Sequence, residues 1–293
     1  MKKLILGLFV VFGISACSLG NDDIDTSCGS NVNTTFTGIP LLCNYSVKIE
    51  PEKSGALVVT TEEKLLSFFT KHPNSCPNPS DPTIDFTKNY LVGLFAGQKP
   101  TTGYSIKVAS IVENNCEIII NLYEKAPQTG ESTAPTVTYP SDYILIPRTS
   151  KKIFFNKVTN ETTDNVIIGS YAKPCTGDDC QKFYQLNEFN VLKFLNVVAG
   201  SYEFGQYKYL ATSKRGEHSL FTKNIPAEIL AIRGQTKTYG TPDTSTKGGT
   251  YFELRQGTTV TKIYIDNNDT EDQSAAIKAF KKTIQDKITA LKQ

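Results

Sequence analysis

Residues that could carry out catalysis are few in this chain. Its two histidines, His72 and His218, both lie away from any motif with a nucleophile, whereas a Ser-His-Asp or Cys-His enzyme needs its base beside its nucleophile. Gly-x-Ser-x-Gly, P-loop, HExxH and dinucleotide-binding sequences are also missing. The sequence therefore predicts a protein without catalytic residues or cofactor. An enzyme acting on carbohydrate or peptide stays an alternative, because paired carboxylates leave no signature in sequence.

The seven cysteines indicate covalent chemistry of another kind. Cys17 follows a short apolar run and stands apart from the other six, and an even number in an exported chain indicates disulfides. Zinc would need CxxC spacing or nearby histidines, so no metal site is expected. Six cysteines allow fifteen pairings, and by proximity and strand order we expect these three: Cys28 with Cys43, Cys76 with Cys116, and Cys175 with Cys180 across a turn-forming Thr-Gly-Asp-Asp.

An acidic stretch from Asp266 to Asp272 suggests calcium at first sight. An EF-hand loop needs glycine at its sixth position and glutamate at its twelfth, and those positions hold Glu271 and Ile277. The favoured interpretation is a turn followed by a helix N-terminus, where negative charge is stabilised by the helix dipole.

The N-terminus predicts export and a lipid anchor. Met1-Lys2-Lys3 precedes an apolar run from Leu4 to Ile14, which is too short to span a bilayer. The sequence Ile14-Ser-Ala-Cys17 then resembles the lipobox of bacterial lipoproteins, which implies cleavage after residue 16 and acylation, including palmitate, of Cys17. The alternative is an ordinary signal peptide with a chance cysteine.

Residues 17–35 are rich in Ser, Asn, Asp, Thr and Gly and predict a flexible tether. Its cluster Asp22, Asp23 and Asp25 resembles a surface-export tag, with a solvated acidic tether as the alternative. Without Lys2 and Lys3 the net charge of +2 becomes zero, so nothing favours binding to nucleic acid. Residues 17–180 carry a net −5 and residues 181–293 a net +5, which favours a division near Cys180.

The elements around residues 97–105 form the best-defined part of the chain. An apolar strand over 90–96 enters this turn and a second strand over 105–111 leaves it. Pro100 restricts φ, Gly103 can take φ > 0, and Tyr104 follows at the edge of the turn. A simple hairpin loop is one interpretation. A binding loop is the other, with Tyr104 as the anchor and Lys99, Thr101 and Thr102 as hydrogen-bonding neighbours.

The remaining pattern predicts an α+β protein with two mainly antiparallel domains. A capping box at Thr60–Glu63 predicts a short helix ending near His72-Pro73, and strands are expected over 116–123, 143–147 and 152–156. The expected organisation is a signal peptide (1–16), the tether (17–35), a β-rich domain (36–165), a disulfide-closed linker (166–181) and a second α+β domain (182–293).

In the second domain, residues 189–198 are strongly apolar and residues 202–210 are aromatic with an alternating pattern. Residues 250–255 and 260–265 predict a hairpin. A last helix is predicted after Asp269-Thr270 with Gln273 completing a capping box, and its apolar stripe packs on the sheet or binds a partner. The stripe consists of Ile277, Phe280, Ile284, Ile288 and Leu291.

The first domain resembles the PrcB protease-complex family, C-terminal domain type, over about residues 57–157. The resemblance rests on "Asp-Phe-Thr-Lys" at 85–88, "Lys-Pro-Thr-Thr-Gly-Tyr" at 99–104, "Thr-Tyr-Pro" at 138–140 and "Leu-Ile-Pro" at 145–147. Together with the lipobox and the missing catalytic motifs, it implies a non-enzymatic, lipid-anchored outer-membrane protein whose 97–105 turn binds a partner such as an envelope protease. Exposure at the cell surface is the further expectation.

The same turn also resembles the loop of chagasin-type cysteine-protease inhibitors, although Lys99 replaces the asparagine of that family. Its other two loops have no counterpart here, and the chain has no tryptophan. Inhibition of a papain-like protease through the same Pro100–Tyr104 loop is therefore the alternative function.

Overall fold

The computed structural model describes residues 28–77, 83–127, 130–158, 164–172, 180–244 and 247–292. The chain forms two compact units, Met1–Glu161 and Thr162–Gln293. The boundary therefore precedes the linker expected at 166–181. That stretch contains β11 (Asn165–Tyr171), a central strand of the second unit. A run of buried, β-branched residues explains the difference, because Val166, Ile167 and Ile168 are all fully buried.

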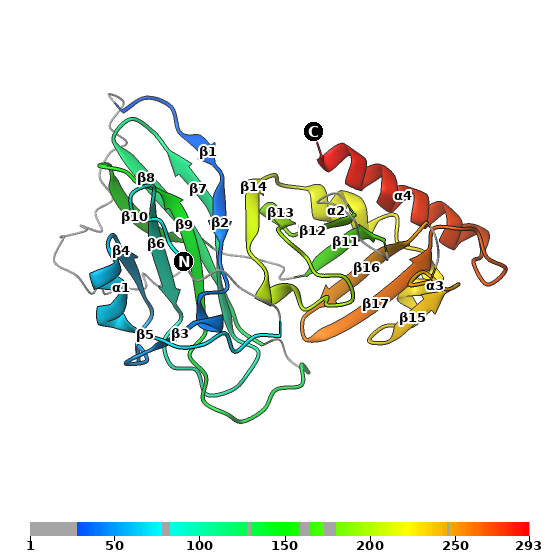
Figure 1. Ribbon diagram of the computed structural model, residues 1–293, viewed down its shortest axis with the longest axis horizontal. Coiled ribbons are helices and arrows are strands. Elements are labelled where there is room, and N and C mark those ends of the chain that lie inside the picture. The colour runs from blue at the N-terminus through cyan, green and yellow to red at the C-terminus, as the bar shows by residue number, and fades with distance from the viewer. Residues whose placement is uncertain are drawn as a thin grey trace, which may run out of the picture. The chain divides into compact units, whose positions relative to one another are not determined.

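The described residues of the first unit form three small groups of paired strands and the α-helix α1 (Figure 1). One four-stranded sheet has the order β1-β7-β8-β10 and the other contains β2-β9-β6-β4, while β3 and β5 form a two-stranded sheet. The bounds are β1 Val32–Thr34, β2 Phe36–Gly38, η2 Leu41–Cys43, β3 Tyr45–Val47, β4 Gly55–Val59, α1 Glu62–Phe68, β5 Phe69–Lys71, β6 Asn89–Phe95, β7 Ser105–Glu113, β8 Glu117–Lys125, β9 Ser141–Pro147 and β10 Lys152–Lys157.

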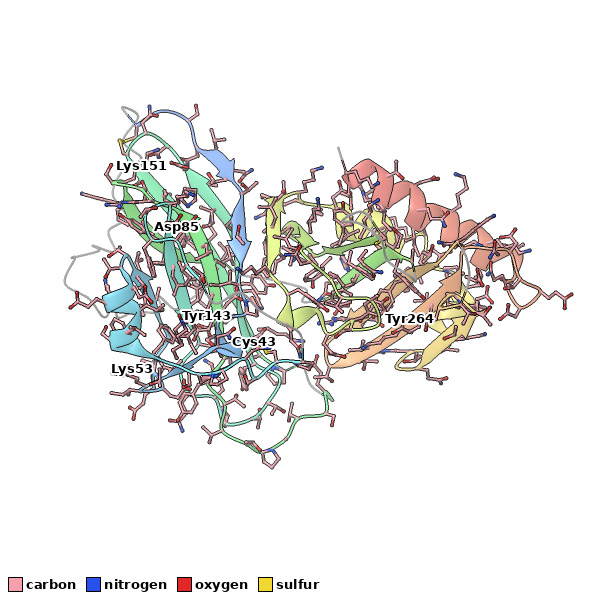
Figure 2. The ribbon with its side chains drawn as sticks, in the orientation of Figure 1. Cys43, Lys53, Asp85, Tyr143, Lys151 and Tyr264 are labelled. Carbon is pink, nitrogen blue, oxygen red and sulfur yellow. A yellow bond between two sulfur atoms is a disulfide. The ribbon has the colours of Figure 1, made fainter. Side chains whose placement is uncertain are left out.

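Strand β6 shows why this part of the chain folds as predicted. It pairs antiparallel with β4 and β9, and both of its faces are apolar and buried. On one face Leu91 and Phe95 join a core with Tyr143, which is labelled in Figure 2. The Tyr143 ring packs edge-on against Phe69 and Phe95 at centroid distances of 5.8 and 6.0 Å. On the other face Val92 and Leu94 are fully buried. The mainly antiparallel α+β prediction is confirmed. The parallel pairs are β8 with β10 and, in the second unit, Thr236–Tyr239 with Thr259–Asp266.

Helix α1 ends earlier than expected. Thr61 caps it, accepting a hydrogen bond from Lys64 N at 3.2 Å. The backbone becomes extended at Phe69, which begins β5 rather than a last helical turn. Phe69 is almost fully buried in the core and pairs with Val47 of β3. Tertiary packing and strand pairing therefore end the helix before His72.

The disulfides join cysteines that are distant in sequence. Cys28 is bonded to Cys116, and Cys43 to Cys76. The predicted pairs Cys28–Cys43 and Cys76–Cys116 are therefore wrong. Cys180 is disulfide-bonded, whereas Cys175 and the predicted acylation site Cys17 lie outside the described residues.

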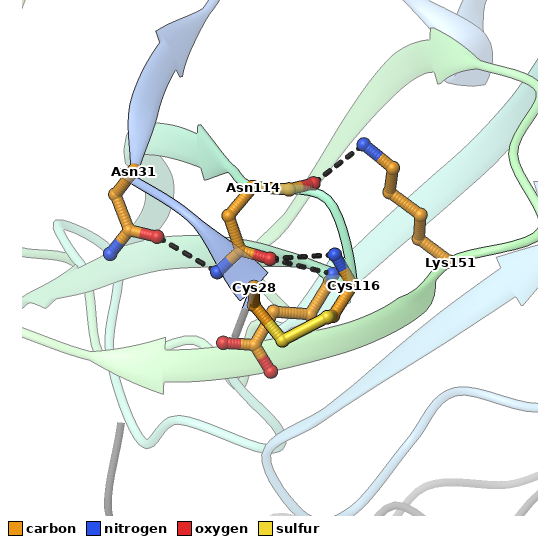
Figure 3. The surroundings of a disulfide bond; sticks show 6 residues. Cys28, Asn31, Asn114, Cys116 and Lys151 are labelled. Carbon is orange, nitrogen blue, oxygen red and sulfur yellow. Dashed lines mark hydrogen bonds between the residues drawn. A yellow bond between two sulfur atoms is a disulfide. The ribbon is translucent and has the colours of Figure 1, made fainter. Parts of the chain in front are cut away.

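Strand pairing is the reason for the first of these bonds. Antiparallel pairing of β1 with β7 brings Val32 opposite Glu113, so Cys28 reaches the β7–β8 turn. There Asn115 N donates to Cys28 O at 2.9 Å, and Asn114 Oδ1 accepts from the backbone N–H groups of Cys116 and Glu117 at 2.9 Å each. Figure 3 shows Lys151 closing the same turn with a 2.6 Å bond to Asn114 O.

The second unit contains the strands β15-β17-β16-β11-β12-β13-β14, in that order. The predicted hairpin is confirmed as β16 and β17, which pair antiparallel from Gly249–Asp266 to Gln256–Thr259. The other bounds are β12 Gln181–Leu186, β13 Asn190–Phe194, η3 Phe204–Gln206, β14 Tyr209–Ser213, α2 Glu217–Thr222, α3 Ala227–Leu230, β15 Thr236–Tyr239, β16 Gly249–Gln256, β17 Thr259–Asp266 and α4 Ala275–Leu291.

Aromatic side chains cover one face of this sheet. Of the apolar stretch 189–198 only Asn190–Phe194 forms a strand, β13, and most of the alternating stretch 202–210 precedes β14 and includes η3. Tyr202 and Phe204 from this segment pack on Phe183 at centroid distances of 5.0 and 5.2 Å. Tyr251 and Tyr264 (Figure 2) join them at 5.1 Å from each other. Burying these rings stabilises the segment between β13 and β14 more than continued strand pairing would, so the alternating pattern does not form a strand there.

Helix α4 covers the opposite face of the sheet and contacts β11, β12 and β16. Four residues of the predicted stripe are buried and Leu291 is partly buried against them, so the stripe belongs to the core. The helix begins later than expected. Ser274 is the N-cap and accepts from Ile277 N at 3.1 Å, while Gln273 donates instead to the carbonyls of Asp266 and Asn268.

Candidate functional site

The turn between β6 and β7 is fastened to the rest of the first unit at its base. Gly97 has φ +75°, and a Cβ there would lie 2.7 Å from the backbone carbon of Lys53. Gln98 N donates to Glu52 O at 3.1 Å, and Ser54 Oγ donates to Ala96 O at 2.8 Å. The base of the turn is therefore held by close backbone contact that no larger residue would allow at position 97.

The 97–105 turn and the loop that follows β8 form one structure. Lys99 and Thr138 exchange backbone hydrogen bonds of 2.8 and 2.9 Å. Thr102 N donates to Ala134 O at 3.1 Å, and Thr102 Oγ1 accepts from Ala134 N at 2.8 Å. Thr138 Oγ1 also donates to Thr101 O at 2.9 Å. These bonds hold the two segments in one conformation although more than 30 residues separate them.

The charged side chains of these segments are turned inward and paired. Lys99 and Lys157 both contact Glu124, at 3.4 and 3.2 Å, and the side chains of Lys99 and Glu124 are only 19% and 14% exposed. Lys125 and Glu131 form a second pair at 3.6 Å, with side chains 11% exposed. An inward-facing pair keeps most of its Coulomb attraction because little water screens it.

The exposed side chains at the outer end carry no charge. This set, which we call the uncharged tip, consists of Gln98, Pro100, Ala134, Pro135, Thr136 and Val137. Val137 leaves 49% of its surface exposed. Neighbouring backbone is already hydrogen-bonded within the turn and loop, so the tip offers apolar and amide groups on a rigid support.

The predicted binding residues fall into three groups. Pro100 is exposed, as a contact residue must be. Thr101, Thr102 and Tyr104 are half-buried, and Lys99 Nζ lies 5.7 Å from the centroid of the Tyr104 ring. Gly103 has a positive φ of +92°, as predicted, and a Cβ added there would lie 3.0 Å from Pro127 Cγ.

Sequence reasoning missed the residues that complete this surface. Ala134 to Val137 lie in a long loop with two prolines, Pro127 and Pro135. The length of the loop and these prolines were the features of the sequence that could have pointed to a functional surface there. A contact between that loop and Lys99 depends on β8 returning antiparallel to β7, which places Lys125 opposite Ser105.

The described part of the chain offers two further observations. No three of its His, Cys, Asp and Glu side chains are grouped so that they could hold a metal ion. None of its helices is long and apolar enough to cross a membrane.

Residues 90–147 match the family model described as PrcB C-terminal. This stretch is similar to the PrcB C-terminal family. The match confirms the resemblance over the region that holds β6 to β9, the 97–105 turn and the loop up to Thr138. No curated protein and no solved structure matches the chain.

Proposed function

We propose that the chain is a non-enzymatic, lipid-anchored envelope protein that binds a protein partner through the uncharged tip. The partner that the PrcB family description supports best is a component of a protease complex in the same envelope. The proposed location is the bacterial outer membrane, with acyl chains on Cys17 as the anchor.

One observation carries this proposal: charges are directed inward and uncharged groups outward on the same segments. The centres of protein interfaces are depleted of charged residues, because a charge loses its hydration there without a matched partner. A surface loop with no function would be expected to expose its lysines and glutamates. The backbone bonds between the turn and the loop also reduce the conformational entropy that binding would otherwise cost.

Aspartate substitutions in the uncharged tip test the proposal. Pro100→Asp and Val137→Asp each place a charge at the proposed contact, and each should reduce capture of the native envelope partner by the purified protein at least about ten-fold, or ~1.4 kcal/mol. Capture by the wild type should change little between low salt and about 0.5 M NaCl, because no charged groups are involved. Both are measured by pull-down from detergent-solubilised envelopes and quantitative mass spectrometry.

Val32→Asp is the matched control, because Val32 is 64% exposed on β1, away from the tip. Equal capture by the control and both tip variants, all with wild-type melting temperatures, would contradict the proposal. Inhibition of papain below about 1 μM, lost in Pro100→Asp, would favour the chagasin-like alternative instead.

The proposed anchor has a separate test. Cys17→Ser should release the protein into the soluble fraction or leave an uncleaved precursor, because acyl chains contribute about 0.8 kcal/mol for each buried CH₂ group and the variant has none. Cell fractionation with mass analysis of the N-terminus measures this, and Ser18→Ala should behave as the wild type. A processed Cys17→Ser protein that still sediments with membranes would exclude the lipid anchor.

A further inference from the structure

A lysine lies buried beneath the acidic loop between β17 and α4. Lys281 belongs to α4 and is 5% exposed, although lysine is rarely buried without partners. Its stem points from the helix toward Asp266–Gln273, the stretch whose acidic composition suggests calcium. The partner-binding site proposed above lies in the first unit and does not involve this lysine.

Five oxygen atoms surround the Lys281 ammonium. Three are consecutive backbone carbonyls, of Asp266 at 3.0 Å and of Asn267 and Asn268 at 3.3 Å. The other two are Asp269 Oδ1 at 2.9 Å and Gln273 Oε1 at 2.8 Å. The arrangement is thus a cage of carbonyl, carboxylate and amide oxygens, the ligand types that bind hard cations in proteins.

Hydrogen bonds within the loop position its oxygen atoms around this ammonium. Gln273 directs its amide oxygen to the ammonium while its Nε2 donates to the carbonyls of Asp266 and Asn268, at 3.0 and 2.9 Å. The hydrogen bond from Lys281 is also the main cause that lowers the pKa of Asp269 below its usual value. The three shorter distances, 2.8 to 3.0 Å, lie within the range of about 2.7 to 3.2 Å for N–H···O hydrogen bonds, and the two of 3.3 Å lie just beyond it. All five exceed the 2.3–2.6 Å of calcium–oxygen contacts.

We propose that Asp266–Gln273 is a cation-binding loop whose resident cation is the ammonium of Lys281. The site selects an ammonium-class, hydrogen-bond-donating monovalent cation rather than calcium. Because the cation is part of α4, its binding fastens the N-terminal half of the helix to the end of β17. In the second unit, Lys281 therefore closes this acidic loop, a task for which other folds use a calcium ion.

Emptying the cage tests this directly. Lys281→Ala should lower the melting temperature of the protein by roughly 5 °C or more, because the carbonyls lose their donor. Ammonium or methylammonium chloride should restore part of that loss by binding in the vacated space. Tetramethylammonium chloride at the same concentration should not, because it has no N–H group to donate. Lys281→Met should be destabilised and unresponsive, since its side chain still fills the space.

Lys282→Ala is the matched control, because Lys282 is the next residue of α4, is exposed and contacts only Asp286 in the described structure. Its melting temperature should stay close to that of the wild type. Wild-type stability should change with neither calcium nor a chelator. A calcium-dependent shift in the wild type would overturn the proposal. So would equal melting temperatures of Lys281→Ala and Lys282→Ala, or equal effects of ammonium and tetramethylammonium on Lys281→Ala.

If the Lys281→Ala variant does not fold, amine labelling of the wild type tests whether the Lys281 ammonium is held in the cage. Lys281 should react at least about ten-fold more slowly than Lys282 in the folded protein, because its ammonium is buried and hydrogen-bonded. Similar labelling rates at the two positions, measured by peptide mass spectrometry, would overturn the cage.

Discussion

Replacing Cys28 and Cys116 together by serine should lower the free energy of unfolding of the first unit by about 4 to 5 kcal/mol. The bond spans a sequence separation of 88 residues, and cross-linking restricts the unfolded chain more as the closed loop lengthens. The loss should also free β1, whose three residues pair only with β7. Urea unfolding measures the first effect, and hydrogen exchange at Val32–Thr34 measures the second.

The second disulfide provides the control. Cys43 and Cys76 are separated by 33 residues, so the corresponding serine pair should cost somewhat less, about 3 to 4 kcal/mol, and leave β1 protected. Peptide mapping without reduction should recover Cys28 linked to Cys116 and Cys43 linked to Cys76. Recovery of Cys28 linked to Cys43 would contradict both the connectivity and the expected difference between the two variants.

Gly169→Ala should destabilise the second unit by about 3 kcal/mol, at the upper end of what overpacking costs. Gly169 lies in β11 and pairs with Phe183 of β12 and Tyr251 of β16. An added Cβ would lie 2.2 Å from Phe183 Cδ1. The ring cannot retreat easily, because it is fully buried and packs on Tyr202 at a centroid distance of 5.0 Å. Urea unfolding followed by near-ultraviolet circular dichroism of the tyrosines reports the change.

Gly205→Ala is the matched control, because a Cβ there meets nothing within 4 Å. It should stay within about 0.5 kcal/mol of the wild type. In a Phe183→Leu background the further cost of Gly169→Ala should fall by at least about half, since the clashing ring is gone. Equal unfolding midpoints for the two glycine variants would contradict the close approach of Phe183 to β11.

Patterns over short distances in sequence predicted much of the fold. The apolar runs that became β6 to β9, the hairpin β16–β17 and the stripe on α4 could be read directly, because the alternation or spacing of apolar residues specifies which face is buried. Proline and glycine at 100 and 103 predicted a shaped turn, and Gly103 adopts the left-handed conformation. The family resemblance was equally local, since all of its motifs except that at 85–88 lie within one matched stretch, 90–147.

The ends of elements were predicted less well, because packing competes with local preference at each end. The helix pattern continued toward His72, yet Phe69 gains more by entering the core and pairing with β3. The capping box at Thr270 and Gln273 was present in the sequence, but Gln273 is used by the cage around Lys281. Ser274 caps the helix instead.

Local sequence patterns were therefore sufficient for the main strands of the first unit, the β16–β17 hairpin, the last helix, the shape of the 97–105 turn and the similarity of residues 90–147 to a family. Only the tertiary structure decided which cysteines are bonded, that Lys99 faces Glu124, that Ala134 to Val137 complete the uncharged tip, and that Lys281 supplies the cation for an acidic loop. The physical reason is the same in each case. These contacts join residues 8 to 88 positions apart, and strand register and helix packing, rather than sequence spacing, bring such residues together.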